Sequence, residues 1–144
     1  MSQTDFPPRL KIITVDDSPI VTKRILSILT EMRYIEFLGS ARNFLAALDL
    51  IAQQVPDVVI LDIHLDENMP HANGIDLLIT LRQRYPGIKI IMFTNLTLPQ
   101  YRNRCLEFGA DYFLDKSNDF YKIPEALEEI RTAVAHIKRK TSAN

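Results

Sequence analysis

The chain has 144 residues, about the size of one globular domain with a single core. Its 17 lysines and arginines nearly balance 18 aspartates and glutamates, so the formal net charge of -1 provides no overall field to attract nucleic acid or an anionic membrane. No apolar run approaches the roughly 20 residues of a membrane span, and the N-terminus lacks the pattern of an export signal, so we expect a cytoplasmic protein.

The first part of the chain predicts two strands, each followed by a helix. A run rich in isoleucine predicts a strand over residues 10–15, buried on both faces. Ser18 is the expected N-cap of the next helix and Pro19 suits its first position, where a missing N–H does no harm. The apolar stripe of this helix comprises Val21, Ile25, Ile28, Leu29 and Met32. A strand over residues 35–39 and a helix over residues 44–53 follow.

The rest of the chain repeats the strand and helix unit three times. Strands are predicted over residues 58–61, 89–93 and 112–114. The expected helices start near Gly74 and at Pro99, and a last helix follows the fifth strand. Their inward residues are Ile75, Leu78 and Leu81, then the lone cysteine Cys105, and then Ile123, Leu127, Ile130, Val134 and Ile137. Five such units predict an α/β fold, an open and doubly wound parallel sheet with helices on both faces.

Polar residues follow four of the predicted strands. Asp16 and Asp17 follow the first strand, Asp62 the third, Thr94 the fourth and Lys116 the fifth. Because ligands of open α/β sheets bind beyond the carboxyl ends of the strands, we expect these side chains to share one cleft. Carboxylates about 6 Å apart repel by about 3 kcal/mol per pair at an effective dielectric of about 20. Bound Mg²⁺, with oxygen ligands and room for phosphate oxygens, would relieve this repulsion.

Asp62 has the surroundings of a nucleophile in phosphoryl transfer. A cation and the Lys116 ammonium would offset the charge of an incoming phosphoryl group, with the Thr94 hydroxyl across the cleft. A phosphatase that forms an aspartyl phosphate would need a second aspartate two residues later, and His64 stands there instead. A flavodoxin-like cofactor module would need a loop that cradles phosphate after the first strand, where this chain has acids.

The segments IITVDDS, VVILD, IIMFT and GADYFLDK, in this order and spacing, resemble the receiver domain of two-component response regulators. The resemblance covers about residues 10–138 and implies a flavodoxin-like (βα)5 sandwich with strand order 2-1-3-4-5. It also implies that Asp62 accepts a phosphoryl group. Mg²⁺ would be bound by Asp62, by Asp17 directly, by Asp16 often through water, and by the backbone carbonyl of His64.

The resemblance assigns three further roles at the site. Thr94 would bond to the phosphoryl group, and Lys116 would pair with it. Phe113 would be the switch aromatic, which turns inward as Thr94 moves toward the phosphate. Gly74 lies farther from Asp62 than the loop glycine of the family usually does, so the loop over residues 65–73 is lengthened.

The implied function is that of a single-domain response regulator, which catalyses its own phosphorylation and dephosphorylation and is otherwise no enzyme. Its expected partners are a sensor histidine kinase or phosphotransfer protein and a downstream protein target, with no nucleic acid and no membrane. We expect an N-terminal extension over residues 1–9, the receiver domain over 10–139 and a flexible tail over 140–144. A phosphorelay intermediate and a scaffold that works without phosphorylation are the alternatives.

Overall fold

The computed structural model describes residues 9–66 and 70–143, with side chains as far as residue 137. Strands and helices alternate along the whole described chain. In chain order they are β1 (Leu10–Val15), α1 (Pro19–Thr30), β2 (Ile35–Ala41), α2 (Phe44–Gln53), β3 (Val58–Leu61), α3 (Gly74–Arg84), β4 (Lys89–Thr94), α4 (Pro99–Glu107), β5 (Tyr112–Asp115) and α5 (Lys122–Ala143). The strands form one parallel sheet in the order β2-β1-β3-β4-β5, which confirms the predicted fold class.

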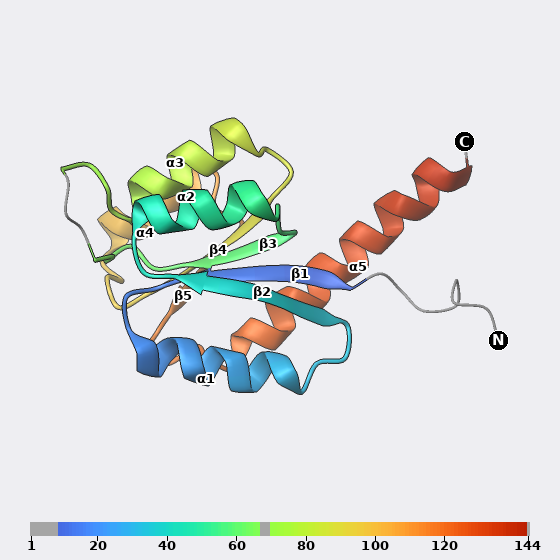
Figure 1. Cartoon of the computed structure of the whole chain (residues 1–144), viewed down its shortest axis with the longest axis horizontal. Coiled ribbons are helices and arrows are strands. Elements are labelled where there is room, and N and C mark those ends of the chain that lie inside the picture. Colours follow the sequence, from blue (N-terminus) through green and yellow to red (C-terminus); the bar gives the residue numbers. More distant parts are fainter. Residues whose placement is uncertain (1–8, 67–69, 144) are drawn as a thin grey trace.

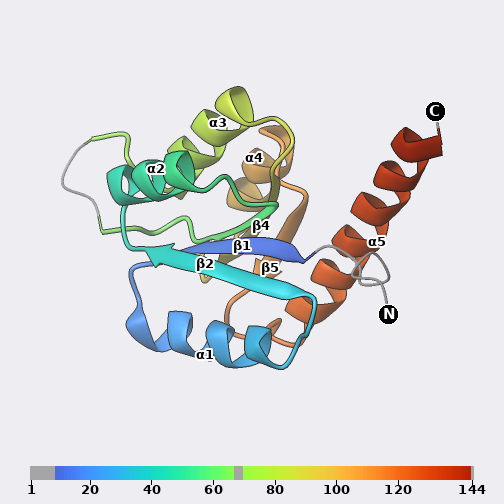
Figure 2. The same ribbon diagram turned by 45° about the vertical axis from the view of Figure 1, so that its right-hand side comes forward.

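The helices cover both faces of this sheet (Figure 1 and Figure 2). Because side chains of a strand alternate between its two faces, Val59 and Leu61 of β3 belong to one core cluster and Val58 and Ile60 to the other. The first cluster takes residues from α2, α3 and α4, and the second takes residues from α1 and α5. The sheet is therefore buried on both faces, as the strands' apolar sequences require.

The helices begin and pack largely as predicted. Ser18 caps α1, where its hydroxyl accepts from the Val21 N–H at 3.4 Å, and Pro19 is the first helical residue. Ile25 and Leu29 are the buried residues of this helix. In α3 the predicted inward residues are buried, and Leu77 is buried as well. Cys105 of α4 is buried in the core, as its spacing indicated.

Three strands end later than predicted, β2 by two residues and β4 and β5 by one residue each. The strand β2 passes through Gly39, which has a φ of 151°, and ends at Ala41. The pairing of β1 with β2 shifts register at this point, so the glycine accommodates an irregularity inside the strand and does not end it. The helix α5 continues to Ala143, into the segment 140–144 that we expected to be a flexible tail, and the domain bounds themselves remain predictions.

The last residue of the predicted α5 stripe does not join the core. Ile123, Leu127 and Ile130 are buried, whereas Ile137 is 61% exposed. Figure 1 shows the reason, because the C-terminal part of α5 projects beyond the end of the sheet. The apolar stripe of α5 therefore extends beyond the part of the sheet against which the helix packs.

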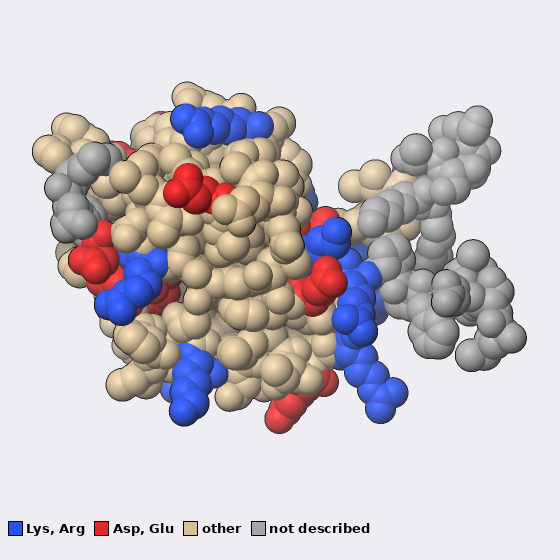
Figure 3. Space-filling model, viewed as in Figure 1, with Lys and Arg blue, Asp and Glu red and all other residues tan. Residues whose placement is uncertain are grey.

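The surface fits the balanced composition of the chain. On the face seen in Figure 3, acidic and basic side chains of the described residues lie interspersed on a mainly uncharged surface. Within the described residues, no helix has both the length and the apolar character needed to cross a membrane.

Candidate functional site

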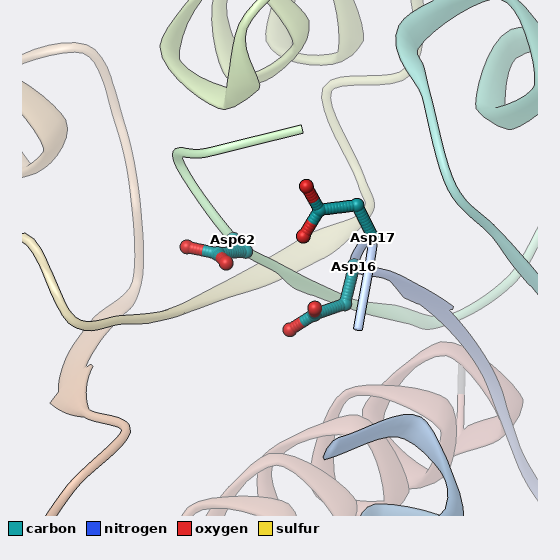
Figure 4. Close-up of side chains that lie close together, drawn as sticks. All are labelled: Asp16, Asp17 and Asp62. Atoms are coloured by element: carbon teal, nitrogen blue, oxygen red, sulfur yellow. The ribbon is translucent and has the colours of Figure 1, made fainter. Parts of the chain in front are cut away.

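Three carboxylates meet at the carboxyl ends of β1 and β3. The two strands are neighbours, and Val15 pairs with Leu61, so Asp16 and Asp62 directly follow paired residues. Asp17 extends from the same turn as Asp16 (Figure 4). One carboxylate oxygen from each of the three side chains lies within 4.8 Å of the others. We call these three residues the acidic cluster.

Lys116 joins the acidic cluster from the end of β5. Its Nζ lies 2.8 Å from Asp16 Oδ2 and 2.6 Å from Asp62 Oδ2, and all three side chains are buried. Burial alone would lower the pKa of Lys116, but the hydrogen bonds to Asp16 and Asp62 raise it above its ordinary value. Burial raises the pKa of Asp16, although Lys116 and the Ser18 N–H act in the opposite direction. The lysine therefore stays an ammonium ion between the two carboxylates.

The charges of this site leave room for a divalent cation. Three carboxylates and one ammonium carry a formal charge of -2 when all are ionised. At about 5 Å and an effective dielectric of about 20, each pair of carboxylates repels by about 3 kcal/mol. An oxygen donor set of this kind suits a hard ion such as Mg²⁺. The residues present therefore fit the metal that the sequence analysis predicted.

Thr94 ends β4, the strand next to β3, whereas Phe113 lies inside β5. Thr94 is fully buried at the end of β4, and its hydroxyl accepts a hydrogen bond from the Leu96 N–H at 3.2 Å. The Thr94 carbonyl accepts from the Lys116 N–H at 3.0 Å, so the two residues are joined through the backbone. Phe113 of β5 is partly buried against the core cluster that α2, α3 and α4 share. The phosphoryl contact of Thr94 and the inward turn of Phe113 remain predictions.

The start of α3 closes one side of the acidic cluster. Gly74 opens this helix, and its N–H donates to the Ile63 carbonyl at 2.7 Å. A Cβ atom on Gly74 would lie 1.9 Å from the backbone oxygen of Asp62, so the close approach requires glycine. Leu65 and Ala72, near the two ends of the lengthened loop, are buried. Residues 67–69 of that loop lie outside the described residues.

Two side-chain contacts at the site were not predicted from the sequence. The Nδ1 atom of His64 lies 3.2 Å from Asp17 Oδ2, although we had assigned only the His64 backbone carbonyl to the site. The Ser117 hydroxyl donates to Asn95 Oδ1 at 3.1 Å. The sequence did hold a signal for the second contact, because Asn95 and Ser117 follow closely on Thr94 and Asp115, which end neighbouring strands and pair with each other. Both contacts lie at the exposed side of the site.

Proteins with similar sequences are known. The family model described as the response regulator receiver domain matches residues 12–128. A protein-glutamate methylesterase/protein-glutamine glutaminase of Bacillus subtilis (strain 168) is 38% identical over 127 residues, which is 83% of this chain. A protein of the same name from Trichodesmium erythraeum (strain IMS101) is 33% identical over 137 residues, 92% of this chain.

A solved structure agrees with the fold. The signal receiver domain of the putative response regulator NarL from Mycobacterium tuberculosis superposes with a TM-score of 0.77 at 23% identity, covering 88% of this chain and 98% of that one. The chain spans only about a third of the two methylesterases, 34% of the Bacillus protein and 35% of the Trichodesmium protein. The sequence similarity to them therefore concerns only part of each protein.

Proposed function

The chain belongs to the family of response regulator receiver domains, and on that premise we propose that Asp62 accepts a phosphoryl group in a reaction that requires Mg²⁺. The observation that carries the proposal is the pair of contacts made by Lys116, which place an ammonium ion 2.6 Å from Asp62 Oδ2 and 2.8 Å from Asp16 Oδ2. The phosphoryl donor is a histidine of a sensor kinase or of a phosphotransfer protein.

The transfer is a displacement at phosphorus. A carboxylate oxygen of Asp62 forms the new O–P bond, the bond from phosphorus to the donor breaks, and its electron pair leaves with the donor. Lys116 holds the Asp62 carboxylate in place and offsets negative charge that develops beside it. Asp16, Asp17 and Asp62 would hold Mg²⁺, with the His64 backbone carbonyl as a further ligand. When bound, this ion offsets the charge of the phosphoryl oxygens.

The output is a changed surface for a downstream protein. The Thr94 hydroxyl accepts a bond from the Leu96 N–H in this structure, and a hydroxyl that accepts one hydrogen bond can donate another. This hydroxyl then donates to a phosphoryl oxygen, and Phe113 turns farther into the core that it already touches. The two phosphorylation states thereby differ in the surface around β4 and β5, and the downstream partner binds one of them more tightly.

Intact-mass measurement tests the acceptor directly. The chain is incubated with Mg²⁺ and acetyl phosphate, beside the variant Asp62→Asn and the control Asp49→Asn, which changes an exposed carboxylate on α2. We expect the unmodified chain and Asp49→Asn to gain the mass of one phosphoryl group. Asp62→Asn and a sample with a metal chelator should gain none. A phosphoryl group that Asp62→Asn still accepts would contradict the proposal.

A further inference from the structure

We propose that the imidazole of His64 is a ligand of the metal ion at the acidic cluster, and that it selectively strengthens binding of a divalent transition metal ion such as Ni²⁺. The inference rests on the proposed function, because the ion concerned is the one that Asp16, Asp17 and Asp62 would hold. It adds a nitrogen donor to a site that the resemblance describes with oxygen donors alone.

The position of the ring carries the proposal. His64 Nδ1 lies 3.2 Å from Asp17 Oδ2, an oxygen donor of the acidic cluster. Metal bonds of first-row divalent ions to nitrogen and oxygen are about 2.1 Å long, so two ligands on adjacent corners of an octahedron lie about 3 Å apart. The two atoms form a hydrogen bond here, at a separation that also suits two ligands of one ion. The ring lies outside the group of ligand atoms that are within 4.8 Å of one another, so it turns toward Asp16 and Asp62 when the ion binds. The N–H of His64 also donates to Asp62 Oδ1 at 3.3 Å, which keeps the residue beside the cluster.

The exposure of the ring allows Nδ1 to act as a donor of electrons. The His64 side chain is 76% exposed and that of Asp17 is 26% exposed, so both atoms lie at the open side of the site. In the hydrogen bond to the Asp17 carboxylate, which only accepts, Nδ1 carries the proton. In the other neutral tautomer the proton is on Nε2, where water accepts the hydrogen bond. The Nδ1 lone pair is then available to an ion held by Asp17.

The type of donor determines which ions gain from it. Carboxylates and carbonyls suit Mg²⁺, whereas imidazole suits nickel, copper, zinc and iron. A site with oxygen donors and one imidazole would therefore still bind Mg²⁺, and removal of the ring should affect a transition metal ion much more. His64 thus gives the proposed phosphorylation site a preference for transition metal ions that oxygen ligands alone do not give.

Isothermal titration with Mg²⁺ and, separately, with Ni²⁺ tests the proposal on the whole chain. The variant is His64→Gln, whose amide keeps a polar side chain with an oxygen donor but has no imidazole nitrogen. We expect its Ni²⁺ affinity to fall by at least about tenfold. Loss of a residue that only orients a metal ligand already lowers metal affinity by about 10-fold to 100-fold. The Mg²⁺ affinity of the variant should stay unchanged. In the unmodified chain, Ni²⁺ should also broaden the NMR signals of the His64 ring.

Two control variants identify the site of binding. His71→Asn removes an exposed histidine from the same loop, and asparagine tolerates the φ of 58° found there, so both affinities should remain unchanged. Asp17→Asn should weaken binding of both ions, because it removes a ligand that they share. This comparison separates the acidic cluster from histidine sites elsewhere on the chain.

The outcomes separate this inference from the proposed function. Unchanged Ni²⁺ affinity in His64→Gln would overturn the inference, and so would an equal loss for both ions, which would make His64 only a positioning residue for Asp17. If Asp62 still gains a phosphoryl group in the presence of Mg²⁺, such a result leaves the proposed function intact. Failure of the phosphorylation experiment would instead count against the proposed function.

Discussion

Asp62 is held in place by contacts from three different parts of the chain. Its N–H donates to the Val15 carbonyl at 3.0 Å, and its Oδ2 lies 2.6 Å from Lys116 Nζ. Its backbone oxygen lies against Gly74 at the start of α3. These contacts leave the carboxylate little freedom, which suits the proposed role of Asp62 as a nucleophile, because the reacting atoms must be aligned before the reaction starts.

Gly74→Ala should destabilise the protein and displace Asp62. The new Cβ would lie 1.9 Å from the Asp62 backbone oxygen, so either α3 or the end of β3 must move. Overpacking of this kind costs about 1–3 kcal/mol, and we expect thermal denaturation to show a loss at least that large, with slower phosphorylation by acetyl phosphate. Gly87→Ala is the matched control, because its Cβ would meet nothing within 4 Å. Equal stability of the two variants would contradict the expected clash.

At the scale of elements, the start of α3 links the lengthened loop to the site. Asn73 is the N-cap, and its Oδ1 accepts from the N–H groups of Ile75 and Asp76, each at 2.9 Å. Asp76 in turn accepts from the Asn73 N–H at 3.0 Å, which completes a capping box. Four backbone N–H groups at a helix start have no partner inside the helix, so this arrangement satisfies part of that need.

Asn73→Ala should lower the free energy of unfolding by about 1–2 kcal/mol, the usual cost of losing an N-cap side chain. The upper end is expected because the Asn73 side chain has two backbone partners. Urea denaturation followed by circular dichroism measures the change. Asn103→Ala, at an exposed position inside α4, is the control and should leave stability nearly unchanged. A similar effect of both substitutions would show that the cap contributes no more than an ordinary surface residue.

At the scale of the whole molecule, one thiol and two tyrosine hydroxyls, all buried or partly buried, make the stability of the fold depend on pH in the alkaline range. Burial raises the pKa of the Cys105 thiol from 9.0 to about 11. Burial, and then a hydrogen bond to a glutamate, raises the pKa values of Tyr34 and Tyr112 from 10.0 to about 12. In each case folding favours the protonated form. This stabilisation is complete below the unfolded pKa and decreases as the pH rises through the folded pKa.

The melting temperature should therefore fall as the pH rises from 9 toward about 11, and fall further toward about 12. Circular dichroism melts at a series of pH values measure this decline. In Cys105→Ala the decline between pH 9 and about 11 should be shallower, because one of the three groups is absent. The cavity left by the substitution lowers stability at every pH and so does not mimic this change in slope. A melting temperature that stays constant through this range would contradict the prediction.

Local sequence patterns were sufficient for the elements and for most of the site. Runs of isoleucine and valine, and apolar residues three or four positions apart, identified all five strands and part of the buried residues of the helices, because burial imposes these periods. Asp16, Asp17, Asp62 and Lys116 could be placed at one edge of the sheet because all parallel strands end there. The order of the strands came from the resemblance to a family and was confirmed.

The tertiary structure alone decided how long the elements are and which side chains touch. The exposure of Ile137 depends on where the sheet ends beneath α5, and the register shift at Gly39 depends on the pairing with β1. The double contact of Lys116 crosses from β5 to side chains at β1 and β3, and that of His64 reaches Asp17 from another loop. A sequence determines which residues can be buried or can form a helix, since those are local properties. Distances between side chains far apart in the chain follow only from the packed fold.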